Sequence, residues 1–316
     1  MVTWLIDNGK SRRVEDGFEP SFYVYSSQSN LFKLASDLQD ISQVKNLNFT
    51  RYRLSLDQEK KLVLEITPRT LSSLKKLASM IDRWGKYRTY QLYNVDIRLS
   101  TRYLQHRGVF SNARVKWDGI QFILLDEQWA IDYDYPQFKT LNMNIERKTG
   151  FQSLHEPIKS INIDDETIVE ENEEDTLLNA VKYIHRKDPD IIYTIEGDSF
   201  LLPYIYYRAK ECNIAKDVNF GREKIQRQRP VKQAKSYFSY GQIVYRPAFY
   251  TLQGRVHIDK HSSFLYDESG LRGLVDISRC ANIPLQLQSR LGPGTAISQI
   301  QVNKVMQKGY LIPWKK

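Results

Sequence analysis

The segment Asp188–Ala209, with the sequence DPDIIYTIEGDSFLLPYIYYRA, constrains the fold more than any other part of the chain. Its apolar run Ile191–Tyr193 is short and bounded by polar residues, as expected for a buried strand. A turn follows at Gly197–Asp198, and the apolar stretch Phe200–Tyr207 predicts the beginning of a helix. The sequence therefore predicts a buried strand, a tight turn and an apolar helix in this order.

Length and composition indicate a globular protein of two domains. The chain has 316 residues, of which 41% are apolar, enough for two hydrophobic cores of ordinary size. No apolar run approaches the roughly 20 residues that a membrane-spanning helix needs, and the N-terminal sequence lacks the apolar core of a signal peptide. The two cysteines, Cys212 and Cys280, do not make a disulfide framework or a zinc site. We expect an intracellular protein without a membrane partner.

The charge balance favours a polyanionic partner. The formal net charge is +9, and the stretch from Tyr204 to Lys260 holds 12 Lys or Arg against 4 Asp or Glu. Basic residues interleaved with tyrosines suit single-stranded DNA, because bases stack on aromatic rings and phosphates pair with cations. Alternating aromatics are also ordinary in β-sheets, so a purely structural explanation stays open. The predicted nucleic-acid contacts are Arg222, Lys224, Arg227, Arg229, Lys232, Lys235 and Tyr240.

Periodicity predicts the order of elements along the chain. In the first 117 residues, alternating strands and two amphipathic helices indicate a compact α+β domain. The predicted strands are 22–25, 62–66, 119–125 and 138–145, and the predicted helices are 32–40, 71–84, 175–185, 271–280 and 297–307. The segment 162–175 is polar and acidic, and we expect 216–236 to be a basic loop.

Several segments resemble family-B DNA polymerases. Asp188–Ala209 resembles their second exonuclease motif, roughly DPDII-x-x-YNGDNFD-x-PYL-x-x-RA. Phe18–Val24 resembles the F-x-PYFYV strand of the N-terminal domain, and Gly254–Asp259 matches the GRVHID strand late in the exonuclease domain. Asp96-Ile97 with Arg102-Tyr103-Leu104 resembles the DI-x-x-x-x-RYL helix, and Leu274–Lys316 is similar to the region ahead of the palm in a divergent archaeal branch with eroded motifs. The matches follow the family's order over most of the chain.

The resemblance implies a fold and a domain plan. Residues 1–130 would form the family's α+β N-terminal domain, and residues 131–290 an RNase-H-like, exonuclease-type α/β domain with a mixed central sheet. Residues 291–316 would form a helical tail leading towards a palm. The palm, fingers and thumb of the family do not occur in these 316 residues, so the resemblance suggests a subunit or fragment of a split polymerase with a separately encoded catalytic chain.

The resemblance also places the nuclease motifs, which need several carboxylates converging on two divalent ions. In the first motif, Asn144 replaces the family's Asp, whereas Glu146 is retained. In the second, Leu201 replaces the metal-binding Asp and Glu196 replaces an Asn; in the third, Asp267 matches weakly and is interpreted as surface charge. Because leucine cannot ligate a metal, we predict an inactivated proofreading site and assign no catalytic residue and no metal ligand.

The resemblance implies a non-catalytic role. We expect the chain to bind template or primer-template DNA and to support a separate palm-fingers-thumb chain in replication or repair, in the cytoplasm at the nucleoid. We expect no cofactor for the chain alone, with Mg²⁺ entering only through a residual nuclease site or the polymerase partner. The alternatives are an active metal-dependent 3′–5′ exonuclease that uses Glu146 with substitute ligands, and a stand-alone single-stranded DNA-binding protein.

Overall fold

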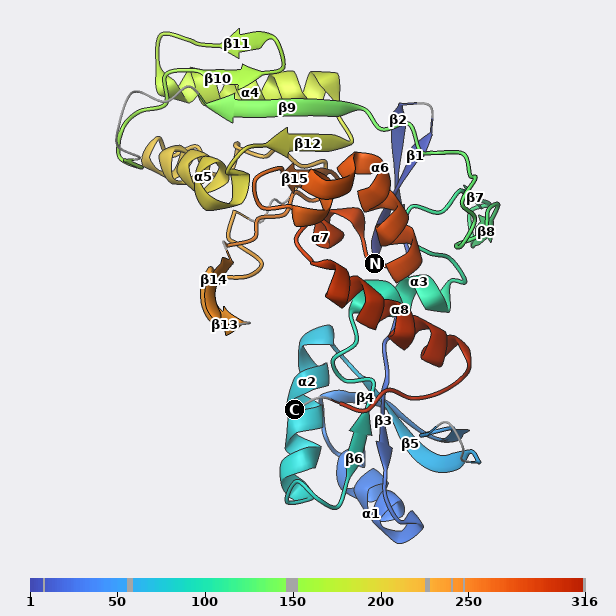
Figure 1. Cartoon of the computed structure of the whole chain (residues 1–316). Helices are drawn as coiled ribbons and strands as arrows, with labels where there is room; N and C mark the ends of the chain where they lie inside the picture. Colours follow the sequence, from blue (N-terminus) through green and yellow to red (C-terminus); the bar gives the residue numbers. More distant parts are fainter. Residues whose placement is uncertain are drawn as a thin grey trace.

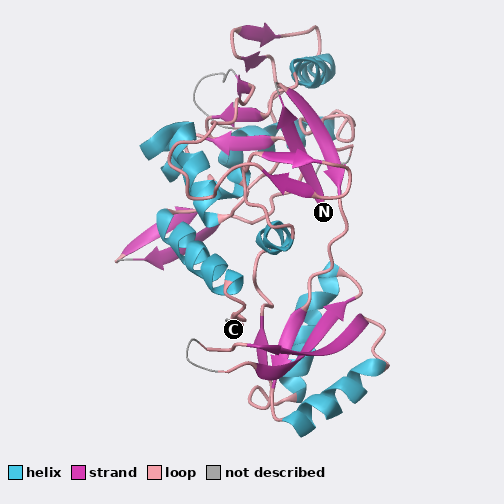
Figure 2. Ribbon diagram, turned by 90° about the vertical axis from the view of Figure 1, so that its right-hand side faces the viewer, coloured by secondary structure: helices cyan, strands magenta, loops and turns pink. Residues whose placement is uncertain are grey.

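The molecule has two bodies, each built around its own sheet, with helices packed between them (Figure 1). The computed structural model describes residues 1–7, 9–55, 59–145, 153–224, 228–239, 241–246 and 248–314. Figure 2 shows the same two bodies after a turn of 90°, with the chain's C-terminus beside the lower one. The mixture of helix and strand in both bodies agrees with the α/β fold class that the sequence predicts.

The lower body is a four-stranded antiparallel sheet with two helices. The strand order is β4-β5-β3-β6. Its elements are β3 (Phe22–Tyr25), α1 (Gln28–Gln39), β4 (Val44–Tyr52), β5 (Lys61–Pro68), α2 (Leu71–Trp84) and β6 (Gln91–Tyr93). Both predicted helices form, because their apolar residues recur at three- and four-residue spacing and are buried as one face against the sheet.

The upper body holds a mixed five-stranded sheet in the order β11-β10-β9-β12-β15. Its elements are β9 (Thr140–Ile145), β10 (Ile161–Ile163), β11 (Glu166–Ile168), α4 (Glu173–Lys187), β12 (Ile191–Thr194), a π-helical turn (Gly197–Leu201), α5 (Leu202–Glu211), β15 (Val256–Asp259) and α6 (Phe264–Ala281). Strands β9, β12 and β15 are parallel, whereas β10 and β11 are antiparallel to their neighbours. This arrangement confirms the mixed central sheet.

The two faces of this sheet have different coverings. On one face, Leu141, Met143 and Ile145 of β9 pack in a core with α4 and α5. On the other face, Tyr193 of β12 and Ile258 of β15 pack with α6. Because side chains alternate along a strand, each strand contributes to both layers.

The acidic segment contains more structure than its composition predicts. Strands β10 and β11 form a short antiparallel hairpin there. The following helix begins with Asn172 as its cap, whose side chain accepts from the N–H of Asp175. Thr176 is buried and donates its hydroxyl back to the Asn172 carbonyl.

The remaining elements connect the two bodies or project from them. They are β1 (Val2–Asp7), β2 (Lys10–Glu15), α3 (Leu99–His106), β7 (Val115–Trp117), β8 (Phe122–Leu124), β13 (Lys235–Ser239), β14 (Gln242–Arg246), α7 (Leu285–Gln288) and α8 (Pro293–Gln307). The hairpin β13–β14 lies apart from the sheets and projects beside them (Figure 1). Within the described part of the chain, no helix is long and apolar enough to cross a membrane.

Both chain ends pack across the predicted domain boundaries. Trp4 of β1 and Arg13 of β2 donate to Glu223 in the upper body, at 3.0 Å each. The segment after α8 returns to the lower sheet, where the N–H of Trp314 donates to the carbonyl of Leu92 at 2.9 Å. A division of the chain near residue 130 therefore places the two sheets in different parts, but residues from both sides of the division pack against each other.

Candidate functional site

Two of the nuclease-motif positions lie on opposite sides of the upper sheet. Along β9, Asn144 is exposed and alternates with Met143 and Ile145, which are buried. Leu201, at the end of the π-helical turn, is 2% exposed and belongs to the same apolar core as Met143 and Ile145. Asn144 and Leu201 therefore do not converge on a common ligand.

The other motif positions do not complete a set of carboxylates. Glu196 stands at the turn after β12 with a left-handed backbone, φ 57°, a conformation that Asn tolerates better than Glu. Asp267 is exposed in the first turn of α6. Glu146 lies outside the described residues. Among the residues that are described, no three His, Cys, Asp or Glu side chains are grouped as a metal site would require.

These positions do not fit the divalent ions of a two-metal nuclease. Mg²⁺ is held by carboxylate and other oxygen ligands, with charge on the protein side to balance it. At the second-motif position the side chain is a leucine in an apolar core, and at the first it is a neutral amide. At Asn144 and Leu201, the residue types as well as their placement do not fit the family's metal arrangement.

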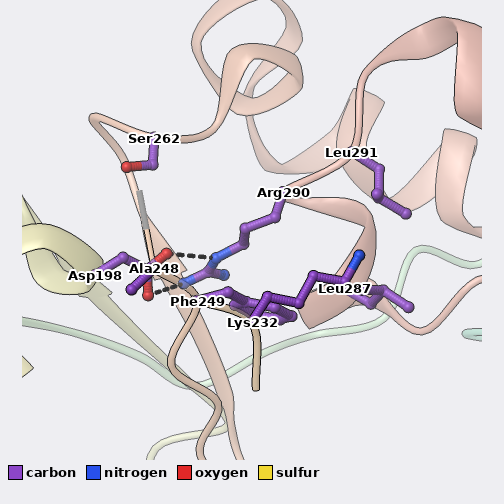
Figure 3. Close-up of a pocket in the computed structure, with 8 residues that line it drawn as sticks. All are labelled: Asp198, Lys232, Ala248, Phe249, Ser262, Leu287, Arg290 and Leu291. Atoms are coloured by element: carbon purple, nitrogen blue, oxygen red, sulfur yellow. Dashed lines mark hydrogen bonds and ion pairs between the residues drawn. The ribbon is translucent and has the colours of Figure 1, made fainter. Parts of the chain in front are cut away.

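A buried polar network lies on the core side of the β12 turn. His257 is fully buried in β15 and shares a 2.8 Å hydrogen bond with the Thr194 hydroxyl. Asp198 accepts from Arg290 Nε at 2.9 Å and from the Tyr250 N–H at 3.0 Å. Figure 3 shows Arg290 reaching Asp198 across the pocket that Lys232, Phe249 and Leu287 help to line.

This network gives Asp198 and His257 structural roles. Asp198, which the sequence places in a turn, is the buried anion that holds Arg290. His257 belongs to the same network; burial, and then the charge of Arg290, lower its pKa to about 4. Arg290 was not predicted, because its partners precede it by 33 and 92 residues and no local pattern marks it.

A second polar cluster, also missed from the sequence, lies at the carboxyl ends of β12 and β15, beside Asn142 in the middle of β9. The ammonium group of Lys260 donates to Asn142 Oδ1 at 2.9 Å. It also lies 4.6 Å from the ring centre of Tyr193 and 5.9 Å from that of Tyr266. The only signal in the sequence is a lysine directly after the GRVHID strand, at the end of a parallel strand where ligands commonly bind.

The structure corrects the role of Arg222. Its side chain is 6% exposed and pairs with Asp188 at 2.8 Å and Asp190 at 2.9 Å. It also donates to the carbonyls of Gly254 and Asp188 and lies over the ring of Trp4. Four of its five N–H donors are thereby used, so Arg222 fastens β1 to the upper body and is not placed to contact DNA.

The other predicted nucleic-acid contacts fall into three groups. Lys224, Arg229 and Lys235 are exposed. Lys232 is exposed as a residue but lines the pocket beside Arg290 and Asp198. Arg227 and Tyr240 lie outside the described residues. The described residues of the segment 216–236 are mainly irregular, as predicted, and lead into β13.

The hairpin that follows adds exposed aromatic surface. Phe238 and Tyr245 are 74% and 62% exposed. Phe238 is opposite Ile243, which is 78% exposed, and Ser236 is opposite Tyr245, so these residues share one face of the hairpin. One face therefore combines exposed aromatics with Lys235 and Arg229 close by in the sequence.

Comparison with known proteins agrees with this architecture. Residues 134–265 match the family described as DNA polymerase family B, exonuclease domain. A DNA polymerase of Archaeoglobus fulgidus is 25% identical over 230 residues, which is 67% of this chain and 28% of the relative. A DNA polymerase of Methanocaldococcus jannaschii is 23% identical over 270 residues, 77% of this chain and 15% of the relative. The chain thus spans less than a third of either relative's length.

The fold has a solved counterpart. The structure of the family B DNA polymerase from the hyperthermophilic archaeon Pyrobaculum calidifontis superimposes with a TM-score of 0.65 at 16% identity, covering all of this chain and 51% of the other. At that identity the likeness concerns the fold. The sheet topology, the motif order and these matches together support a similarity of this chain to the exonuclease region of archaeal family-B DNA polymerases.

Proposed function

We propose that this region binds DNA without cleaving it, as a non-catalytic exonuclease-type module of a family-B polymerase. The observation that carries the proposal is Leu201. The residue at the family's metal-binding position is packed into the apolar core with Met143 and Ile145. A carboxylate there would be desolvated at high cost, and Asn144 contributes no charge on the other side of the sheet.

The surface supports the binding half of the proposal. The hairpin β13–β14 presents Phe238 and Tyr245 for stacking. The cations Lys224 and Arg229, which precede the hairpin in the sequence, and Lys235, at its start, are exposed. Stacking of one base on an aromatic side chain contributes about 1–3 kcal/mol. Such a surface holds single-stranded DNA through ring faces and phosphates, without reading its sequence.

The test is binding of a labelled oligo(dT) by fluorescence anisotropy, in EDTA and in Mg²⁺, with the integrity of the DNA followed on a gel. We expect equal affinity in both buffers and an intact strand. Replacing Phe238 and Tyr245 together by Ala should weaken binding about tenfold or more. Phe32→Ala is the matched control, since Phe32 is 52% exposed on α1 in the other body.

Two results would contradict the proposal. The first is the absence of binding by the unaltered protein at low salt. The second is Mg²⁺-dependent shortening of the strand that Glu146→Ala abolishes, because this would establish the nuclease alternative.

The proposed module would work beside the polymerase elements of its relatives. The support is that both archaeal relatives are DNA polymerases and that the chain aligns with only part of each. Purification of the native protein, followed by mass spectrometry, tests the proposal. Equal amounts of a polypeptide with palm and fingers motifs are expected, and recovery of this chain alone would favour a stand-alone DNA-binding protein.

A further inference from the structure

The Lys260 cluster occupies the edge of the sheet where α/β proteins commonly hold ligands. Asn142 of β9 is directly opposite Tyr193 of β12, and Tyr193 is opposite Ile258 of β15. The N–H of Lys260 continues the ladder by donating to the Thr194 carbonyl at 2.9 Å. Strands β12 and β15 thus end side by side, next to β9, which continues to Ile145, and α6 begins a few residues later at Phe264 (Figure 1).

The lysine is held by a set of positioned groups. Asn142 donates its backbone N–H and its side-chain amide to Asp164 Oδ1, at 2.8 and 3.1 Å. This orients the amide oxygen of Asn142 towards Lys260, where it accepts at 2.9 Å. Asp164 has a left-handed backbone, φ 50°, and its N–H donates back to the Asn142 carbonyl. The carboxylate of Asp164 is therefore engaged with Asn142 rather than with the lysine.

The two tyrosines complete the cluster. The rings of Tyr193 and Tyr266 lie 5.3 Å apart and both face the ammonium group. Tyr193 is 7% exposed, whereas Tyr266 is half-buried at the start of α6. Cation–π contact with two rings holds the charge in place. Among the described residues no carboxylate forms an ion pair with Lys260.

The position matters because Asn142 precedes Asn144 by two residues on the same face of β9. Two residues along a strand correspond to about 7 Å. The ammonium group of Lys260 therefore contacts a residue that is one strand repeat from the first nuclease-motif position. The described β9 side chains on this face, among them Asn142 and Asn144, are neutral. A lysine ammonium binds phosphate as a point charge.

We propose that Lys260, Asn142, Tyr193 and Tyr266 form a metal-independent site for a phosphate of single-stranded DNA. This inference rests on the proposed DNA-binding function and adds its location. The free N–H donors of Lys260 would meet the phosphate oxygens, and the adjoining base would stack on Tyr266. A fixed ammonium group neither supplies nor activates a water molecule, so the strand is held and not cut.

The experiment measures oligo(dT) affinity in EDTA over a series of salt concentrations for the whole chain and three variants. Lys260→Gln removes the charge, and Lys260→Arg retains it. Lys182→Gln is the matched control, since Lys182 also donates to an asparagine, Asn179 at 3.2 Å, but lies exposed on α4, which packs on the other face of the sheet. Circular dichroism and thermal unfolding establish that each variant is folded.

We expect Lys260→Gln to weaken binding about fivefold or more and to reduce the slope of log K against log salt by about 0.7, the value for one phosphate on a single strand. Lys260→Arg should retain most of the affinity, and Lys182→Gln should bind like the unaltered chain. Oligonucleotides carrying 5-iodouracil should cross-link to Tyr266 under ultraviolet light, because stacking brings the base to the ring.

The outcomes separate this inference from the proposed function. In one outcome the unaltered chain binds oligo(dT), the Phe238/Tyr245 double variant binds more weakly, and Lys260→Gln keeps the affinity and salt slope of the unaltered chain. The hairpin then binds DNA, and the proposed phosphate site at Lys260 is wrong. If the unaltered chain does not bind, the proposed function itself fails. Lys260→Gln could instead lose binding to dTMP or to inorganic phosphate while its affinity for oligo(dT) is unchanged. This result would also overturn the strand-binding site, because the ligand would then be a free phosphate compound.

Discussion

At the residue scale, Gly197 determines the geometry of the turn after β12. A Cβ at this position would lie 1.9 Å from the Thr194 hydroxyl and 2.6 Å from Nε2 of His257. Neither neighbour can withdraw easily, because the two are buried and hydrogen-bonded to each other. The glycine is therefore required for close approach, while its backbone angles are accessible to other residues.

We expect Gly197→Ala to destabilise the protein by about 2 kcal/mol or more, since the added methyl group must displace the Thr194–His257 hydrogen bond. Urea unfolding followed by circular dichroism measures the difference. Gly17→Ala is the control, since no atom lies within 4 Å of the Cβ it would add. Equal stability of the two variants would show that the turn can relax.

His257 also predicts how stability depends on pH. Burial and the neighbouring Arg290 lower its pKa from 6.5 to about 4, so the folded protein resists protonation of this ring. In the unfolded chain the ring binds a proton near pH 6.5, and stability is therefore lost as the pH falls from about 6.5 towards 4. The loss is at most on the order of 3 kcal/mol.

Unfolding free energies measured between pH 7 and 4 test this expectation. His257→Gln should have a flatter profile over that range, even though its stability at pH 7 is lower. His185→Gln, at an exposed ring that contacts the Asn219 carbonyl, should keep the slope of the unaltered protein. If the unfolding free energy of His257→Gln depends on pH as steeply as that of the unaltered protein, another titrating group causes the loss of stability.

At the element scale, one ion pair joins the beginning of α4 to the middle of α5. Arg208 donates Nε and Nη2 to the two carboxylate oxygens of Glu173, at 2.8 and 2.6 Å. The two side chains are 12% and 10% exposed, and Glu173 also accepts from the N–H of Ile158. The pair therefore connects both helices to the loop before β10.

Breaking this pair should be costly, because the remaining charge stays largely buried. We expect Glu173→Gln to destabilise the protein by about 3 kcal/mol, measured by urea unfolding at pH 7. Glu174→Gln, at the exposed neighbouring position, should have a small effect. A comparably small effect of Glu173→Gln would mean that the ion pair stabilises the folded protein little more than hydration of the separate charges does.

The same carboxylate contributes to acid sensitivity in a lower pH range. Burial raises the pKa of Glu173, but the hydrogen bonds from Arg208 and Ile158 outweigh burial, and the pKa is lowered overall. Its contribution to stability is therefore complete above the ordinary carboxyl range and is lost as the pH falls through the lowered folded value. Glu173→Gln should therefore lose less unfolding free energy than the unaltered protein when the pH falls through this range.

At the scale of the whole molecule, the last residues complete the first sheet. Leu311 is 3% exposed and packs with Tyr23, Val63 and Tyr93 of the lower body. Asn94 and Ile312 exchange two hydrogen bonds, each of 2.8 Å. The chain thus closes on itself across more than two hundred residues.

Removing this contact should loosen the lower body selectively. We expect Leu311→Ala to cost about 2–5 kcal/mol, as for other buried leucines, and to reduce hydrogen-exchange protection in β3, β5 and β6 more than in β9 and β12. Lys308→Ala, at an exposed residue nearby, is the control. A uniform loss of protection across both sheets would indicate that the two bodies unfold as a single unit.

Local patterns in the sequence determined the elements that depend on near neighbours. Helix α2 and strand β12 follow from periodicity and apolar runs within a few residues, and both form where predicted. The order of motifs along the chain resembles that of family-B polymerases, and this resemblance predicted the mixed sheet. The leucine at position 201, where the resembling family has a metal-binding Asp, was likewise visible in the sequence, because residue type can be read without the fold.

The tertiary structure decided what each charged side chain contacts. Arg222 stands in a basic stretch and was predicted to contact DNA, yet Asp188 and Asp190, more than thirty residues earlier, enclose it. The sequence marks Lys260 only by its position directly after the GRVHID strand, and its hydrogen bond with Asn142 joins residues 118 positions apart. Charge and periodicity are local properties of a sequence, whereas burial and ion pairing depend on which distant strands become neighbours, so only the folded sheet separates a structural cation from one that is free to bind phosphate.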